Sequence, residues 1–259
     1  MTIVEYFVIL LAVIKEEILV RLKGSEIMEN FKEVMKRAKK LYGDGKWKEA
    51  RDLLYPFLEI ELPAKETSKH RRLLGWCYYY IGKKNIENPK ESGEWAVTCW
   101  EDVTDLNASK ADVDSALAGL PLAYQYLLKD NQKAIELAEK RVEEASSDKS
   151  RRVALNSRGC IERDSGFTLK ALEAFSQAYQ VKEPDDDPRT VANVWNNRAI
   201  TLMQIVPYLT SSKKAVIKEV EDLFHQAEYY YKLHEVKSEE SAEFHLRGIK
   251  IKLRELEKL

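Results

Sequence analysis

The sequence feature that most constrains the fold is a pair of small residues that recurs at one fixed separation. Gly159 and Ala171 stand twelve positions apart, and Ala38 and Ala50 do as well. Phe175 follows Ala171 by four positions, which is the rhythm of one helical face. Small side chains on facing helices let two backbones approach closely, while an aromatic ring fills the space beside them. The pattern predicts helix pairs, each of which leaves an apolar face for the next pair to bury.

Five such pairs can be followed along the chain, and they resemble the tetratricopeptide repeat (TPR). The resemblance is clearest around Trp47, which follows a Gly-Asp-Gly turn, and around Gly159. The units cover residues 28–62, 65–107, 110–147, 149–183 and 188–235, with a polar insertion over 83–93. The resemblance implies an all-α, right-handed superhelix, a TPR-like solenoid, whose concave side is formed by the first helix of each pair.

The spacing of the pairs departs from the family's nominal period, which is roughly 34 residues. The small-residue positions of the five first helices are separated by 37, 47, 37 and 40 residues. These positions are Ala38, Gly75, Leu122, Gly159 and Ala199. Leu122 departs from the small-residue rule, so the third unit matches the family least. We therefore describe the repeats as TPR-like.

A final helix over residues 238–258 is predicted to cap the last pair. Ser238 is a favourable residue for the start of a helix. The helix carries a single apolar stripe, and charged residues occupy its other side. The stripe consists of Ala242, Leu246, Ile249, Leu253 and Leu256. One face is expected to pack and the other to face water, as the last element of a repeat array requires.

The composition favours helices and shows no overall charge bias. Only ten Gly and seven Pro occur in 259 residues, so few positions interrupt a helix. Lys and Arg number 42 and Asp and Glu number 43, and this formal charge of -1 disfavours a dedicated nucleic-acid binder. Basic clusters over residues 32–40 and 65–72 keep RNA binding by helical repeats as a lesser alternative.

The repeats are expected to form a single domain over residues 28–259. Residues 1–27 form a separate segment, which is either an N-terminal apolar helix or a non-native extension. The run from Tyr6 to Ile14 is apolar but has nine residues, whereas a membrane span needs roughly 18 or more. Three interpretations stay open. The run could pack on the first repeat, act as a weak hydrophobic anchor, or be translated upstream sequence with the natural start at Met28.

No pattern of catalytic or metal-binding residues accompanies the repeats. The sequence lacks a Gly-rich phosphate loop, and none of its four histidines has a metal-binding spacing. The three cysteines, Cys77, Cys99 and Cys160, are an odd number at no metal-ligand spacing, which favours free thiols in a reducing cytoplasm. We therefore expect a cytoplasmic protein that is not an enzyme and holds no metal and no cofactor.

The resemblance implies that ligands bind the concave surface, because neighbouring helices use the packing faces. Carrying the family's groove positions onto this chain gives a basic, amide-rich set with interleaved aromatic residues. The set is Lys32, Lys39, Tyr42, Lys69, Arg72, Trp76, Tyr79, Asn156, Arg163, Asn193, Asn196 and Met203. Asn can pair with both groups of a peptide backbone, and Lys and Arg attract carboxylates, so an extended peptide with acidic residues is the expected ligand. A solvated charged face would look the same in sequence, and this alternative stays open.

These features lead to a non-catalytic protein-interaction scaffold as the first hypothesis, with a peptide segment or a partner protein in its concave groove. The second hypothesis is a peptide-responsive regulatory receptor, although no DNA-binding helix-turn-helix segment is evident before Met28. A membrane partner is disfavoured unless residues 6–14 act as an anchor.

Overall fold

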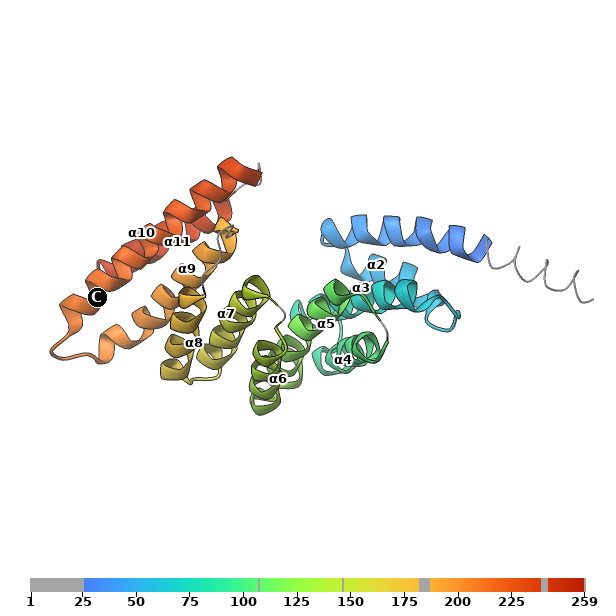
Figure 1. Cartoon of the computed structure of the whole chain (residues 1–259), viewed down its shortest axis with the longest axis horizontal. Coiled ribbons are helices and arrows are strands. Elements are labelled where there is room, and N and C mark those ends of the chain that lie inside the picture. Colours follow the sequence, from blue (N-terminus) through green and yellow to red (C-terminus); the bar gives the residue numbers. More distant parts are fainter. Residues whose placement is uncertain (1–25, 107, 146, 182–186, 239–241, 259) are drawn as a thin grey trace, which may run out of the picture. The chain divides into compact units, whose positions relative to one another are not determined.

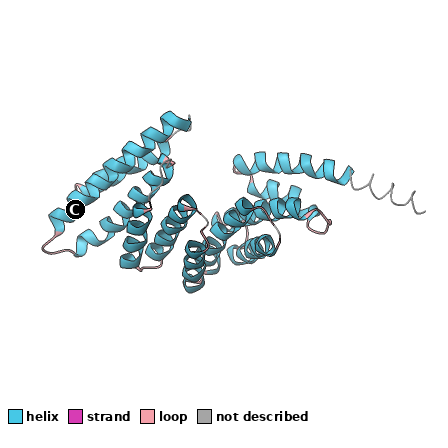
Figure 2. Cartoon of the chain, viewed as in Figure 1, coloured by secondary structure: helices cyan, strands magenta, loops and turns pink. Residues whose placement is uncertain are grey.

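The computed structural model describes residues 26–106, 108–145, 147–181, 187–238 and 242–258. All regular elements in these ranges are helices, and Figure 2 shows only loops between them. None of the described helices combines the length and the apolar character that crossing a lipid bilayer requires. The predicted apolar segment over 6–14 lies outside the described residues.

The chain divides into two compact units, one ending at Gly119 and the other beginning at Leu120. Each unit is described by itself below. The expectation of a single repeat domain over 28–259 therefore stays a prediction.

The described residues of unit 1 form two helix pairs and the helix that begins the third pair. A helix over residues 26–43 is followed by α2 (Trp47–Leu54) and a short 3₁₀ turn, η1 (Tyr55–Phe57). The second pair consists of α3 (Ala64–Lys83) and α4 (Pro89–Asp105), which lie side by side in Figure 1. The next helix, α5 (Lys110–Ala123), runs to the end of the unit and beyond it. These pairs correspond to the predicted units over 28–62 and 65–107.

Unit 2 continues the same alternation. A π-helical turn, η2 (Tyr124–Leu128), leads to α6 (Asn131–Glu143), which is followed by α7 (Asp148–Asp164) and α8 (Thr168–Gln180). The last pair consists of α9 (Pro188–Ile205) and α10 (Lys213–Ser238), and a short 3₁₀ turn, η3 (Val206–Tyr208), extends α9. The final helix, α11 (Glu243–Leu256), follows this pair. From α6 to α11, each helix packs on the next one along the chain.

The predicted close approach of paired helices occurs at glycines that face aromatic rings. A Cβ atom at Gly159 of α7 would lie 2.6 Å from a ring carbon of Phe175 in α8. In unit 1, the buried indole of Trp100 lies between two helices, and a Cβ atom at Gly75 of α3 or at Gly119 of α5 would lie 2.5 Å from it. Nonbonded heavy atoms do not approach so closely, so each of these positions requires glycine.

The small residue of α5 differs from the one predicted. The sequence pattern placed Leu122 at this position, but Gly119 is the residue that meets an aromatic ring, and Leu122 is only partly buried. The cause is the irregular spacing between the second and third units, which displaced the predicted register by one helical turn.

Two helix boundaries also differ from expectation. The polar insertion is shorter than the predicted 83–93, because α4 already begins at Pro89. Proline suits the first turn of a helix, and the Asn88 side chain accepts a hydrogen bond from the backbone N–H of Lys90 at 3.0 Å. The final helix begins at Glu243 rather than at residue 238, since Ser238 instead ends α10.

The apolar stripe of the final helix packs as the sequence predicts. Ala242, Ile249 and Leu256 are buried in a cluster that includes Phe224 and Tyr231 of α10. The remaining stripe residues of α11 are partly buried against the same cluster. The helix therefore covers the apolar face of α10.

The three cysteines are free thiols. Cys77 and Cys99 are buried, and burial raises the pKa of each thiol to about 12. Burial also raises the pKa of Cys160 to about 11. These thiols are protonated at neutral pH, and the buried Cys77 and Cys99 pack as small apolar residues.

Candidate functional site

Three of the basic residues chosen from the sequence meet at a pocket in unit 1. The pocket has a volume of about 420 Å³ and lies between helix 26–43 and the start of α3. We call it the lysine pocket, and its lining residues are Phe31, Lys32, Met35, Lys36, Lys39, Glu66 and Lys69. The structure thus brings Lys32, Lys39 and Lys69 together.

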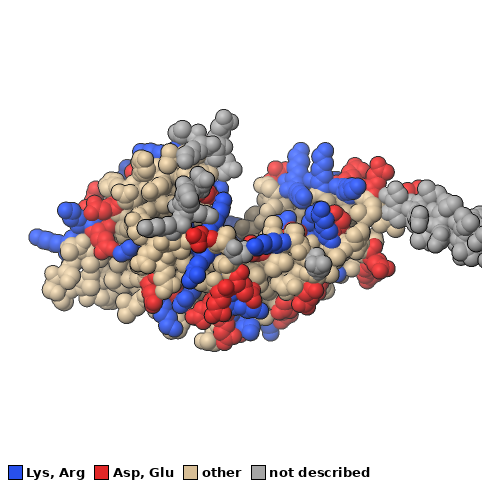
Figure 3. Space-filling model, in the orientation of Figure 1, with Lys and Arg blue, Asp and Glu red and all other residues tan. Residues whose placement is uncertain are grey.

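The helical repeat explains why one helix supplies three of these lysines. Lys32, Lys36 and Lys39 are spaced by four and three positions, so they lie on one face of helix 26–43. Lys and Arg side chains gather over this helix in Figure 3. Lys36 was missed in the sequence analysis, although its spacing from Lys32 was a usable signal.

The lysine pocket combines an apolar floor with a strongly positive rim. Phe31 and Met35 are buried, and they supply the floor. Lys69 Nζ lies 3.0 Å from Oε1 of Glu66, which is the one acidic residue among the described lining residues. Within the described part of the chain, the ammonium groups of the three lysines on helix 26–43 form no ion pair. Four cations against one carboxylate make this pocket suited to an anion.

A buried histidine supports the floor of the lysine pocket. The ring of His70 lies 6.2 Å from the ring of Phe31, and the Nε2–H of His70 donates a hydrogen bond to the Leu54 carbonyl oxygen at 2.9 Å. Burial lowers the pKa of His70, and the nearby Arg71 charge lowers it further. The imidazole is therefore neutral at pH 7 and links α3 to α2.

Arg72 and Trp76 lie between α3 and α5 and make contacts within the protein. Arg72 Nε is 2.7 Å from Oδ1 of Asp112, and this nearly buried carboxylate also accepts a hydrogen bond from Ser109 Oγ at 2.6 Å. Trp76 Nε1 donates a hydrogen bond to Ser115 Oγ at 3.1 Å. The charge of Arg72 is thus neutralised by Asp112, and the ion pair links α3 to α5.

The two tyrosines of the predicted set serve packing. Tyr79 is 2% exposed and belongs to the core, with Lys83 Nζ 5.3 Å from its ring centroid. Tyr42 is partly buried, its ring meets that of Tyr80 edge to face at 5.9 Å, and burial raises its pKa. Tyr79 therefore does not reach the surface, and its ring packs against the indole rings of Trp76 and Trp100.

In unit 2, most of the predicted amide groups connect helices to one another. Asn156 Oδ1 of α7 accepts a hydrogen bond from Asn197 Nδ2 of α9 at 3.1 Å. Asn193 Oδ1 accepts one from the Tyr231 hydroxyl at 2.6 Å. Among the described residues, the Asn196 side chain has no hydrogen-bond partner and is partly exposed. Asn196 is thus the amide of this set that a ligand could engage without breaking an internal bond.

The other two predicted residues of unit 2 are also held by neighbours. Arg163 Nε lies 2.8 Å from Asp164 Oδ1, and Asp164 accepts a hydrogen bond from the Tyr126 hydroxyl. Met203 packs against the core cluster of α9 and α10. Both residues therefore contact other side chains of unit 2.

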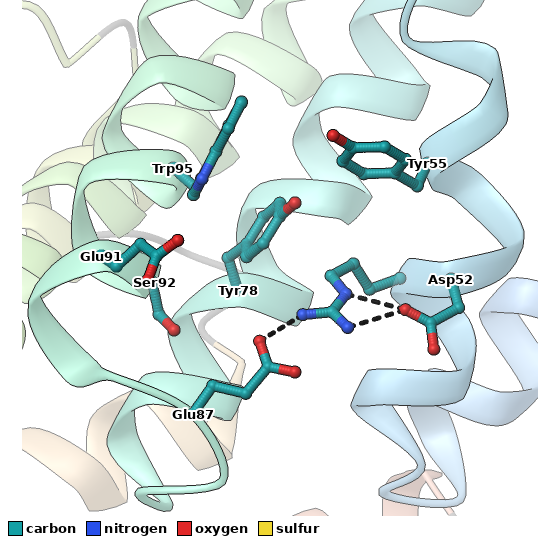
Figure 4. A pocket seen from close by; sticks show the side chains of 8 residues that line it. Asp52, Tyr55, Tyr78, Glu87, Glu91, Ser92 and Trp95 are labelled. Carbon is teal, nitrogen blue, oxygen red and sulfur yellow. Dashed lines mark hydrogen bonds and ion pairs between the residues drawn. The ribbon is translucent and has the colours of Figure 1, made fainter.

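A second pocket of unit 1 was not anticipated from the sequence. It has a volume of about 360 Å³ and is lined by residues of α2, η1, α3, α4 and the loop before α4. We call it the aromatic–acidic pocket, and its lining consists of Arg51, Asp52, Tyr55, Tyr78, Glu87, Glu91, Ser92 and Trp95 (Figure 4). None of its lining residues belongs to the set predicted from the sequence, and the pattern of small residues contains no signal for this pocket.

Unit 2 holds its own pocket, of about 620 Å³, between α8, α9 and α10. Tyr179 and Trp195 form one wall, with ring centroids 4.5 Å apart, and Arg198 pairs with Glu219 at 2.8 Å on the rim. In the part of the chain that the structure describes, no group of three or more His, Cys, Asp or Glu could hold a metal ion.

Comparison with solved structures identifies the fold. The chain is similar to a crystal structure from Podosopora anserina described as kinesin light chain nearly identical TPR-like repeats. The TM-score is 0.53 with 16% identity, and the match covers 77% of this chain and 93% of that one. A crystal structure of a single-residue variant of these repeats gives a TM-score of 0.55 and 16% identity over 81% of this chain and 96% of that one.

The chain is also similar to PlcR from Bacillus thuringiensis, whose structure was determined in complex with the peptide PapR7 and DNA. The TM-score is 0.56 with 11% identity, and the match covers 87% of this chain and 74% of that one. No protein family and no curated protein matches the sequence. These similarities confirm an all-α, TPR-like helical-repeat fold.

Proposed function

We propose that this TPR-like chain is a protein-interaction scaffold that binds acidic residues of an extended peptide segment at the lysine pocket. The observation that carries the proposal is the juxtaposition of four ammonium groups with a buried apolar floor in one pocket. A carboxylate of the peptide would meet the lysines, and a neighbouring apolar side chain would cover Phe31 and Met35. Such a division between charged rim and apolar centre is typical of specific protein interfaces.

The similarity to PlcR supports a peptide as the ligand, since that protein was solved with a bound peptide. Three lysines on one helix face cannot satisfy each other, so their charges favour an anionic partner. Arg72 does not contribute, because Asp112 already neutralises it. The proposal therefore rests on a smaller set than the sequence suggested, namely Lys32, Lys36, Lys39 and Lys69.

Peptide selection with charge-reversed variants tests the proposal. Random 12-residue peptides displayed on phage would be selected on the wild-type chain and on the double variant Lys32→Glu, Lys36→Glu. Wild-type selection should enrich Asp and Glu, and the variant should lose this enrichment. A matched control is Arg37→Glu, Lys40→Glu, which changes the net charge equally on the same helix but outside the pocket. Identical enrichment with all three proteins would exclude the lysine pocket as the binding site.

The second candidate function is a peptide-responsive regulator, which the likeness to PlcR favours. In this case a bound peptide changes the chain's own conformation as well as occupying a pocket. Small-angle X-ray scattering with and without a selected peptide distinguishes the two functions: a regulator changes its radius of gyration, whereas a scaffold keeps it.

A further inference from the structure

We propose that the aromatic–acidic pocket of unit 1 is a second binding site, and that it takes the guanidinium group of an arginine side chain from a partner polypeptide. This pocket is lined by other residues than the lysine pocket, and the proposal holds whether or not the lysine pocket binds a peptide. Its chemistry is opposite, because three carboxylates and one guanidinium line it together with three aromatic rings.

The aromatic part of the pocket offers open ring surface. In Figure 4, Tyr55 and Trp95 lie on either side of Tyr78. Tyr78 is buried and stacks on Trp95 with ring centroids 5.8 Å apart and planes inclined by 15°. Tyr55 is 51% exposed and Trp95 is 38% exposed, so both rings present surface that a ligand can contact. The electron-rich faces of such rings attract cations, and the planar guanidinium group can also stack on them.

The pocket already holds one guanidinium group, which shows that its environment suits this chemistry. The Cζ atom of Arg51 lies 5.7 Å from the centroid of the Tyr78 ring. Arg51 donates hydrogen bonds to Glu87 and, from Nε and Nη2, to Oδ1 of Asp52 at 2.9 and 2.7 Å. The hydrogen bond from Arg51 lowers the pKa of Glu87, so this carboxylate is ionised at neutral pH. The charge of Arg51 is thus neutralised, and it does not repel a second cation strongly.

Two carboxylates keep acceptor capacity after Arg51 is satisfied. Both hydrogen bonds from Arg51 to Asp52 end on Oδ1, which leaves Oδ2 of Asp52 without a hydrogen bond in the described residues. The Glu91 carboxylate has no ion-pair partner in the same part of the chain. Glu87 differs, because Lys48 Nζ also reaches its Oε1 at 3.2 Å. Charge complementarity therefore selects a cation, and the flat rings with a nearby carboxylate favour arginine over lysine.

The test follows the indole N–H signal of Trp95 by two-dimensional ¹H–¹⁵N NMR, assigned by its absence in Trp95→Phe. The probes are acetyl-Gly-Arg-Gly-amide and acetyl-Gly-citrulline-Gly-amide, in which citrulline replaces the guanidinium with a neutral group of similar shape. The arginine peptide should shift the Trp95 signal in a saturable manner, and the citrulline peptide should bind at least roughly threefold more weakly, as loss of a cation–π contact and an ion pair implies.

Two variants locate the binding. Glu91→Gln should weaken binding of the arginine peptide by roughly threefold or more, since it removes a carboxylate of the pocket. The matched control Glu94→Gln changes a carboxylate on the same helix that does not line the pocket, and it should leave binding unchanged. Glu91 and Glu94 are both exposed, so neither substitution should disturb folding. Equal binding of the two peptides, an unmoved Trp95 signal, or equal effects of the two variants would overturn the proposal.

Discussion

Single residues decide how closely the helices of a pair can approach. Gly159, Gly75 and Gly119 each face an aromatic ring at a distance that leaves no space for a Cβ atom. Gly248 provides a contrast, because it also lies inside a helix but has nothing within 4 Å of a Cβ position. Comparing a glycine that faces a ring with one that faces open space therefore distinguishes the effect of packing from the general preference of helices for alanine over glycine.

Substituting alanine at Gly159 and at Gly248 should therefore have opposite effects. Gly159→Ala should lower the free energy of unfolding by about 1 to 3 kcal/mol, because the new methyl group displaces Phe175. Gly248→Ala should raise it by about 0.5 to 1 kcal/mol through helix propensity alone. Chemical denaturation of both variants measures these changes. An unchanged stability of Gly159→Ala would contradict the described packing of α7 on α8.

Arg72 shows why a surface role cannot be assigned from one helix alone. Asp112, which neutralises it, lies forty positions later in the chain and on another helix. The sequence predicts the correct face of α3, since Arg72 is partly exposed, but it contains no signal that α5 covers part of this face. By contrast, Lys32 and Lys39 lie on helix 26–43, which has no preceding neighbour among the described residues to cover them, and Lys69 of α3 lines the same pocket.

Arg72→Ala should consequently affect stability rather than ligand binding. Removing the guanidinium leaves the nearly buried Asp112 carboxylate without its ion pair, which should cost about 1 to 3 kcal/mol of unfolding free energy. The double variant Arg72→Ala, Asp112→Asn should recover part of this loss, because it removes the buried charge as well. Thermal denaturation of the three proteins checks the expectation, and equal stability of wild type and Arg72→Ala would show that the pair contributes nothing.

Whole helices were easier to predict than their ends. The alternation of apolar faces and polar turns located the helix pairs, and the stripe from Ala242 to Leu256 located α11. The boundary at Pro89 was missed, since a polar segment next to a proline looks like a loop until the cap at Asn88 is seen. The boundary at Glu243 was missed because Ser238, which suits the start of a helix, instead ends α10. The register of α5 was missed because leucine at position 122 was taken for the packing residue in place of Gly119.

The end of η2 offers a test at the scale of one element. Lys129 terminates this turn with a φ angle of 61°, in the left-handed region where side chains with a Cβ atom are strained. Lys129→Gly should raise the free energy of unfolding by about 0.5 to 1 kcal/mol, because glycine adopts this conformation without strain. Lys133→Gly inside α6 is the control and should destabilise by about 1 kcal/mol. Denaturant titration distinguishes the two, and a destabilising Lys129→Gly would argue against the left-handed cap.

At the scale of the whole molecule, balanced composition conceals strong local charge. The formal charge of -1 suggested no partner, yet one pocket of unit 1 is basic and another is largely acidic. Which charges meet in space depends on contacts between helices, and composition does not contain this information. The likeness to solved structures establishes the fold, whereas the pockets carry the functional proposals.

Stability should fall in mildly acidic solution because histidines that are shielded from water take up protons on unfolding. Burial lowers the pKa of His70 and of His245 below the ordinary value, so the unfolded chain binds more protons than the folded chain as the pH drops below about 6.5. The melting temperature should therefore decrease between about pH 7.5 and pH 5.5. His70→Gln should reduce this decrease, since glutamine can still donate to the Leu54 carbonyl but does not titrate. An identical decrease in wild type and His70→Gln would show that His70 is not responsible.

The most direct test is to measure by isothermal titration calorimetry how tightly one acidic peptide binds three proteins. The peptide is one recovered by selection on the wild-type chain, and the proteins are the wild type, a pocket variant and a control variant. The pocket variant Lys32→Glu, Lys36→Glu should bind at least about tenfold more weakly than wild type, because it replaces attraction with repulsion at the rim. The control Arg37→Glu, Lys40→Glu should stay within about threefold of wild type, since its charges lie outside the pocket. Equal losses in the two variants would indicate a diffuse charge effect, and unchanged affinity in the pocket variant would place the peptide on another surface.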